Sequence, residues 1–291
     1  MNLLALPVFY TPRMVADSGS FSPSAAKPAE VVRSWQALGA PLRIVEPPPV
    51  SEEELCLAHD PEFVRDVLAC RRANGFGNRS AEVARSLPYT SGAMLAAARE
   101  AIANGAVAVA PCSGFHHARY ASAAGYCTFN GLVVAAQVLA REKLVRRIGI
   151  LDFDQHYGDG TDAIIGHLSL RYIVHYSAGA EYHSPQQAAS FLESIPGILA
   201  DFADCDVILY QAGADPHIED PLGGWLTTEE LAERDRIVLR TARAMGVPVA
   251  WNLAGGYQSP LRKVLDIHDN TLRACWEVYG ARRGGTQQNP A

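Results

Sequence analysis

The chain has 291 residues, of which 48% are hydrophobic and 19% are charged, which is an ordinary globular composition. A chain of this length can bury a large core within one α/β domain. The formal net charge is −6 and no block of Lys and Arg occurs, so the composition argues against nucleic acid as a partner.

The N-terminal apolar segment, residues 3–10, is too short to span a membrane and has no basic residue before it. We interpret it as the first strand and not as a signal peptide. The six cysteines are scattered and form no C-x-x-C pair, which predicts free thiols in a reducing cytoplasm and argues against a structural zinc ribbon. The sequence therefore predicts a cytoplasmic protein without a membrane partner.

Short apolar runs alternate along the chain with longer helical patterns. The predicted strands are 4–9, 42–45, 106–110, 147–152, 172–176, 207–211 and 248–253. The predicted helices lie near 28–38, 61–73, 91–103, 129–143, 186–201, 228–245 and 259–279. Apolar strands separated by helices indicate a parallel sheet that is covered on both faces, and ligands of such sheets bind beyond the carboxyl ends of the strands. The polar residues 282–291 are predicted to form a frayed tail.

The strand predicted at 147–152 runs into Asp152, Asp154 and His156 and breaks at Gly158 and Gly160. Side chains alternate in an extended chain, so residues two positions apart project to the same side. Two carboxylates and an imidazole crowded together indicate a divalent metal among them. A structural turn that starts the next helix is the alternative interpretation.

An EF-hand calcium loop has a similar spacing of acidic residues, but the sequence does not fit one. Tyr157 stands where the tight turn of that loop needs Gly, and Ala163 stands where its bidentate Glu belongs. A strand, and not a helix, also leads into the motif. We therefore exclude the EF-hand interpretation.

Three further predicted strands end in polar residues of the same kind. His116 and His117 follow the strand at 106–110, Asp215 follows the strand at 207–211, and Tyr257 follows the strand at 248–253. Each residue alone is a weak signal, because an Asp can cap a helix and a Tyr or His can pack in a core. Their coincidence at the carboxyl ends of strands of one sheet favours a single functional site.

These residues make the chain resemble a known family, the zinc-dependent histone deacetylases of the arginase/deacetylase superfamily. The matching stretches are Gly114-Phe-His-His-Ala118, Ala124-Gly-Tyr-Cys-Thr-Phe-Asn-Gly131, Leu151-Asp-Phe-Asp-Gln-His-Tyr-Gly-Asp-Gly160, Gln211-Ala-Gly-Ala-Asp215 and Leu253-Ala-Gly-Gly-Tyr257. Their order and spacing cover most of the chain. The resemblance implies one catalytic domain over residues 1–281, with a three-layer α/β/α fold and a mainly parallel sheet of eight strands.

The resemblance also implies the roles of the site residues. Asp154, His156 and Asp215 correspond to the ligands of one catalytic zinc ion, with a position left open for water and the substrate carbonyl. His117 corresponds to the group that moves the proton, and His116 stabilises charge beside it.

Further positions that match the family complete the implied site. Asp152 orients His116, and Asp159 orients His117. Tyr257 donates its hydroxyl to the developing oxyanion. The Gly125 carbonyl accepts the substrate N–H, and Tyr126 forms one wall of a narrow channel.

The sequence departs from the family pattern at several points. Family members hold a potassium ion with a Ser hydroxyl on the strand after this loop, and we place Ile173 at that position, which argues against full coordination. The aromatic wall expected after that strand is replaced by residues 177–184. An Arg expected behind the zinc ion is not evident in residues 26–30. Leu222 stands where acetylpolyamine-selective members have an acidic gate, which favours substrates like acetyl-lysine.

The sequence thus predicts a zinc-dependent amidohydrolase that removes acetyl or other short acyl groups from lysine side chains of proteins or peptides. Hydrolysis of a small acetylated amine or polyamine is the first alternative. A manganese-dependent ureohydrolase would need further Asp and His ligands for a second metal, and the sequence shows only one set. The intact set of ligands, paired His and Tyr argues against a non-catalytic binding module. A nucleophile at Cys112 or Cys127 would leave Asp154, Asp215 and Tyr257 without a role. Glu181, Glu219 and Asp220 are expected near the mouth of the site, where a negative field would favour cationic substrates.

Overall fold

A computed structural model describes residues 3–280 of the chain. A single sheet lies at its centre, with the strand order β2-β1-β3-β7-β6-β4-β5, and every neighbouring pair is parallel. The strands are β1 (Leu6–Phe9), β2 (Leu42–Val45), β3 (Val107–Ala110), β4 (Ile148–Asp152), β5 (Ile173–Ser177), β6 (Val207–Gly213) and β7 (Val249–Ala254).

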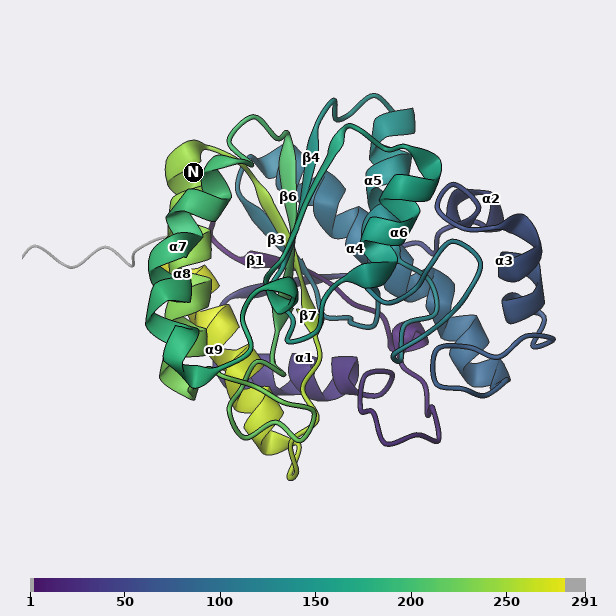
Figure 1. The fold of residues 1–291 in the computed structure, drawn as a ribbon, viewed down its shortest axis with the longest axis horizontal. Coiled ribbons are helices and arrows are strands. Elements are labelled where there is room, and N and C mark those ends of the chain that lie inside the picture. Colours follow the sequence, from purple (N-terminus) through teal and green to yellow (C-terminus); the bar gives the residue numbers. More distant parts are fainter. Residues whose placement is uncertain (1–2, 281–291) are drawn as a thin grey trace, which may run out of the picture.

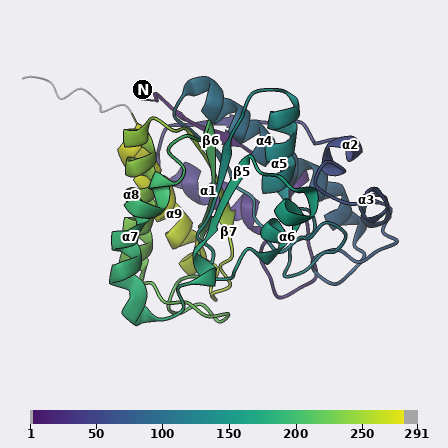
Figure 2. The same ribbon diagram turned by 45° about the horizontal axis from the view of Figure 1, so that its top comes forward.

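Helices cover both faces of the sheet and give the three-layer α/β/α fold (Figure 1). One face is covered by α7, α8 and α9, and the other by α4, α5 and α6, an arrangement that the turned view repeats (Figure 2). The helices are α1 (Lys27–Ala37), α2 (Glu52–Leu55), α3 (Pro61–Leu68), α4 (Ala81–Asn104), α5 (Gly131–Arg141), α6 (Asp159–Leu168), α7 (Ala188–Ala200), α8 (Thr228–Met245) and α9 (Arg262–Tyr279). Short 3₁₀ turns lie at Pro12–Met14, Ala178–Ala180 and Pro185–Gln187.

All seven predicted strands are present, each within two residues of its predicted limits. They form because their apolar residues are buried from both faces, as in β4 and β6, where every residue is buried. The eighth strand implied by the resemblance is absent from residues 3–280, and all strand pairs are parallel. This difference leaves the central strands, which position the site, unchanged.

The helix predicted at 91–103 is longer than expected, because α4 begins at Ala81 and includes Pro88. Proline usually ends or kinks a helix, yet α4 continues through Pro88. Ser80 caps the first turn, and the carbonyl of Pro88 accepts a hydrogen bond from the Val50 N–H at 3.0 Å. The segment that follows β2 is thereby fixed against this helix.

The core consists of two apolar layers, one on each face of the sheet. Trp35, Tyr210 and Trp251 are buried on one face, and Phe63 and Phe129 on the other. No helix within residues 3–280 is both long enough and apolar enough to span a membrane. The predicted tail at 282–291 lies outside the residues that the structure describes.

Candidate metal centre and active site

The polar residues predicted at the strand ends lie together at the carboxyl edge of the sheet. The strands that deliver them, β3, β7, β6 and β4, are neighbours in that order at the centre of the sheet. Because these strands are parallel, the segments that follow them meet at one edge. The sheet topology therefore explains how motifs far apart in the sequence form one site.

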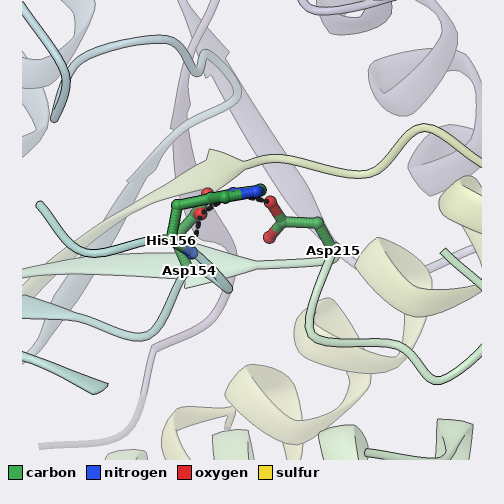
Figure 3. Close-up of side chains that lie close together, drawn as sticks. All are labelled: Asp154, His156 and Asp215. Atoms are coloured by element: carbon green, nitrogen blue, oxygen red, sulfur yellow. Dashed lines mark hydrogen bonds and ion pairs between the residues drawn. The ribbon is translucent and has the colours of Figure 1, made fainter. Parts of the chain in front are cut away.

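Asp154, His156 and Asp215 point toward one another at the centre of this edge (Figure 3). Nδ1 of His156 lies 3.2 Å from Oδ1 of Asp154 and 3.2 Å from Oδ2 of Asp215. One potential ligand atom from each residue lies within 4.8 Å of the others, and this is the one such group of three in residues 3–280. Two carboxylates and one imidazole are the ligand types of a catalytic zinc site, which keeps a fourth position open.

The surroundings of these ligands fit a cation between them. Asp154 and Asp215 are both buried, and Oδ2 of Asp215 accepts no hydrogen bond from the described residues. Burial and the nearby charge of Asp154 raise the pKa of Asp215 to about 7, which shows that two carboxylates are difficult to ionise here together. A divalent cation would neutralise this pair and bind Oδ2 of Asp215, which lies 3.2 Å from His156 but accepts no hydrogen bond.

His116 is fixed beside the metal ligands by Asp152. Its Nδ1–H donates to Oδ2 of Asp152 at 2.8 Å, and its Nε2 lies 3.7 Å from Oδ1 of Asp154. Burial alone would lower the pKa of His116, but Asp154 and Asp152 outweigh it and raise the pKa to about 9. A bound cation would oppose that effect of Asp154. Gln211 donates to the second oxygen of Asp152 at 2.8 Å, so this carboxylate is held from both sides.

His117 is oriented in the same manner by Asp159, the first residue of α6. Its Nδ1–H donates to Oδ1 of Asp159 at 2.7 Å, and Arg119 donates to the other carboxylate oxygen. Burial and the neighbouring His116 lower the pKa of His117, which keeps the imidazole neutral at pH 7. Gly125, with φ of +51°, packs directly against the ring of His117, where a side chain would overlap it.

Tyr257 closes the site from the segment after β7. Its ring lies 5.7 Å from that of Tyr126 and is stacked at 6.1 Å on Phe21. Burial raises the pKa of the Tyr257 hydroxyl, so the group stays protonated and can donate a hydrogen bond. A narrow pocket lies between these residues. It is lined by Ser24, Gly114, His116, Gly125, Tyr126, Cys127, Asp154, Gln211, Ala254, Gly255 and Tyr257.

Lys27 is a site residue whose role the sequence did not reveal. It is fully buried, and its ammonium group donates to the carbonyl oxygen of Gly255. Burial lowers its pKa to about 8, while Asp215 and Asp154 oppose that shift. Residues 26–30 do therefore provide a cation near the potential metal ligands Asp154 and Asp215, although it is a lysine and not the expected arginine. The signal in the sequence is one basic residue in the segment where the resemblance implies an Arg.

The assignment of Ile173 to the missing hydroxyl position is wrong. Ile173 pairs with Ile148 at the start of β5, whereas Ser177 pairs with Asp152 at its end. The Ser177 hydroxyl accepts a hydrogen bond from the Gly158 N–H at 2.9 Å, next to the loop of metal ligands. Ile173 therefore gives no reason to expect incomplete coordination of a potassium ion at this loop. A side chain four residues from the carboxyl end of a strand lies too far from that loop to coordinate the same ion.

The expected negative mouth is also not supported by the contacts of its three carboxylates. Glu219 forms an ion pair with Lys263 at 2.9 Å, and Glu181 accepts a hydrogen bond from Tyr176 at 3.2 Å. Asp220 is buried and accepts two backbone N–H groups. The three carboxylates therefore have partners within the protein and do not form a free anionic ring.

A nucleophilic cysteine is disfavoured by the positions of both candidates. Cys112 and Cys127 are buried, and burial raises the pKa of each thiol above its ordinary value. A buried thiol with a raised pKa forms little of the reactive thiolate. The Cys127 thiol instead donates a hydrogen bond to the Gly125 carbonyl at 3.3 Å.

Comparison with known proteins identifies the family. The sequence model of the histone deacetylase domain matches residues 24–176 and 165–272, which together cover most of the chain. The chain belongs to the histone deacetylase family. It is thus a histone deacetylase-like amidohydrolase, a hydrolase that acts on amides.

Individual relatives support this family assignment. An uncharacterized protein of Picosynechococcus is 28% identical over 262 residues, which cover 82% of this chain and 87% of that protein. A histone deacetylase-like amidohydrolase of Pseudomonas aeruginosa is 29% identical over 172 residues, or 56% of this chain and 45% of the relative. The crystal structure of an acetylpolyamine aminohydrolase from Burkholderia pseudomallei has a TM-score of 0.76 at 18% identity, and covers 95% of this chain and all of that chain. This structural similarity shows that the chain has the same fold as that enzyme.

Proposed function

We propose that residues 1–281 form one catalytic domain that removes acetyl or other short acyl groups from lysine side chains by zinc-dependent hydrolysis. One observation supports this proposal above all others. Three potential metal ligands and two His–Asp pairs lie together at the carboxyl edge of the sheet, and Asp154, His116 and the protonated Tyr257 among these residues line one pocket. A non-catalytic module that only binds a metal would need the three metal ligands but neither the His–Asp pairs nor the Tyr hydroxyl.

Asp154, His156 and Asp215 would hold one zinc ion at this pocket. When bound there, zinc polarises the acyl carbonyl and lowers the pKa of water so that it can attack. Gly213 and Gly255 allow the ligand residues to pack directly against the backbone, because a side chain at either position would overlap Asp154 or Asp215. The chain thereby fixes the ligand geometry before any metal binds.

His117 is proposed to accept the proton of the attacking water and to return a proton to the leaving amine. It is neutral at pH 7 and its Nδ1–H is held by Asp159, so its Nε2 is the atom that can take the proton. His116, held by Asp152 beside Asp154, would stabilise the negative charge that develops on the acyl group. Proton transfer and charge stabilisation thus fall to two adjacent imidazoles.

Tyr257 is proposed to donate its hydroxyl to the oxyanion formed from the acyl carbonyl. Its raised pKa keeps the proton in place, and its ring is confined between those of Phe21 and Tyr126. The Gly125 carbonyl would accept the substrate N–H, and Tyr126 would line the channel that leads to the amide. The products are acetate, or another short acid, and a free amine.

Deacetylation of a small acetylated amine or polyamine is the alternative within the same chemistry. Selection of a polycationic substrate would require free carboxylates near the mouth. Glu219 and Asp220 are instead engaged with Lys263 and with backbone N–H groups. These contacts favour the acetyl-lysine substrate.

Mass-spectrometric screening of the purified zinc-loaded protein would test the proposal. The panel contains acetylated lysine peptides, acetylated polyamines and neutral acetylated amines of matched size, and the free amine is measured. We expect the lysine peptides to give the highest kcat/KM. A preference of about tenfold or more for polyamines would contradict the substrate assignment, and no hydrolysis of any amide would contradict the reaction itself.

A further inference from the structure

Asp220 is a buried carboxylate in the loop between β6 and α8, and none of the roles above uses it. Only 6% of its surface is exposed. Its Oδ2 accepts the backbone N–H of Tyr257 at 2.8 Å, and its Oδ1 accepts the backbone N–H of Leu222 at 3.0 Å. A buried carboxylate is costly unless each oxygen has a partner, so both contacts are needed to keep it in place.

The hydrogen bond to Tyr257 connects two segments that both lead into the site. One follows the metal ligand Asp215, and the other carries the Tyr257 hydroxyl. Two more contacts join the same segments: Gln258 donates to His217 at 2.7 Å, and Lys263 pairs with Glu219 at 2.9 Å. Of these three contacts, the one made by Asp220 is the one that binds the backbone of Tyr257 itself.

Tyr257 needs such a support because of the residues before it. Gly255 and Gly256 have φ values of +45° and +89°, and glycine imposes little conformational preference of its own. The backbone that leads from β7 to Tyr257 is therefore not fixed by local sterics. Lys27 holds the Gly255 carbonyl, and the buried carboxylate of Asp220 adds a constraint on the backbone of Tyr257 itself.

We propose that Asp220 is a positioning residue for Tyr257, which places the Tyr hydroxyl where the oxyanion develops. This inference rests on the proposed function, because it assumes that Tyr257 donates to the acyl oxygen. A preorganised donor is effective only when it is held at the position of the oxyanion, and a displacement of about 1 Å can reduce the rate by about 10²-fold. Asp220 thus acts on the reaction through Tyr257 and not by touching the substrate.

A double-mutant cycle tests this role. Asp220→Ala is made in the wild-type chain and in the Tyr257→Phe variant, and single-turnover reactions are run long enough to measure the residual rates. We expect Asp220→Ala to reduce kcat roughly 10- to 100-fold in the wild type. In the Tyr257→Phe background, where no hydroxyl remains to be positioned, the further loss should be less than about twofold.

Metal content and KM separate positioning from a general structural effect. Zinc content should stay at the wild-type level in Asp220→Ala, and KM should change much less than kcat. Glu219→Ala is the matched control, because this neighbour lies on the same loop but is exposed, and we expect its rate to stay close to that of the wild type. If Asp220→Ala does not fold, Asp220→Asn replaces it, since the amide keeps the volume and one acceptor oxygen.

Equal losses from Asp220→Ala in both backgrounds would contradict the inference, and so would loss of zinc in that variant. Failure of the inference is distinguishable from failure of the proposed function. If the wild type hydrolyses acetyl-lysine peptides and Tyr257→Phe slows it, but the two substitutions act independently, only the role of Asp220 is wrong. If the wild type hydrolyses no acylated amine, the proposed function is wrong.

Discussion

Gly125→Ala should reduce activity by displacing His117. An added Cβ would lie 2.9 Å from Cγ of His117 and still closer to Cδ2 of the same ring. Carbon atoms prefer separations of about 3.5–4.0 Å, so the imidazole would have to move by at least about 0.6 Å. Asp159 holds the opposite side of the ring through a 2.7 Å hydrogen bond, so this movement strains the His–Asp pair. We expect kcat to fall roughly tenfold or more.

A matched glycine separates this contact from the cost of the backbone conformation. Gly105 has φ of +60°, close to the +51° of Gly125, but an added Cβ there would meet no atom within 4 Å. The left-handed backbone should therefore cost about 1 kcal/mol of stability for alanine at either position, and only Gly125→Ala adds the overlap with His117. Steady-state kinetics, thermal unfolding and zinc content are measured for both variants. Normal kcat in Gly125→Ala would refute the placement of His117 in the reaction, as would an equal loss of activity in Gly105→Ala.

Three further predictions concern the metal, the oxyanion donor and the pH dependence of stability. Asp215→Ala should lose zinc and activity together, as metal analysis of the purified variant would show; one bound zinc with normal turnover would rule out the ligand assignment. Tyr257→Phe should retain zinc but lose about 10²-fold in kcat, and loss of the metal would contradict this division of roles. Burial lowers the pKa of His59 from 6.5 to about 4, so the unfolded state binds the proton first as the pH falls. Urea unfolding should show that the free energy of unfolding falls by up to about 3 kcal/mol between pH 6.5 and 4. In His59→Gln the free energy of unfolding should fall less steeply with pH.

Much of the site was predictable because its residues follow strands that the sequence marks clearly. The runs that lead to Asp154 and Asp215 are mainly apolar and buried throughout, and parallel strands bring their carboxyl ends to one edge. The pairs of His116 with Asp152 and of His117 with Asp159 formed as the resemblance implied. The roles of these residues in the reaction stay predictions until variants are measured.

The parts that were not predictable depend on contacts between distant segments. Lys27 lies 228 positions from Gly255, whose carbonyl it binds, and no local pattern marks such a pair. The potassium argument failed because strand register decides which residue of β5 lies beside Asp152, and Ser177 holds that place. The charge of Asp220 was expected to face the substrate, but a carboxylate in a loop can instead turn inward and bind backbone N–H groups.

Titration of the metal-free protein with zinc tests the central claim most directly. Bound zinc and the rate of acetate release from an acetyl-lysine peptide are measured on the same samples as zinc is added. The account predicts that activity is absent without metal, rises in proportion to bound zinc and reaches its maximum at one zinc per chain. Full activity without metal, or a maximum only at two metal ions per chain, would contradict it.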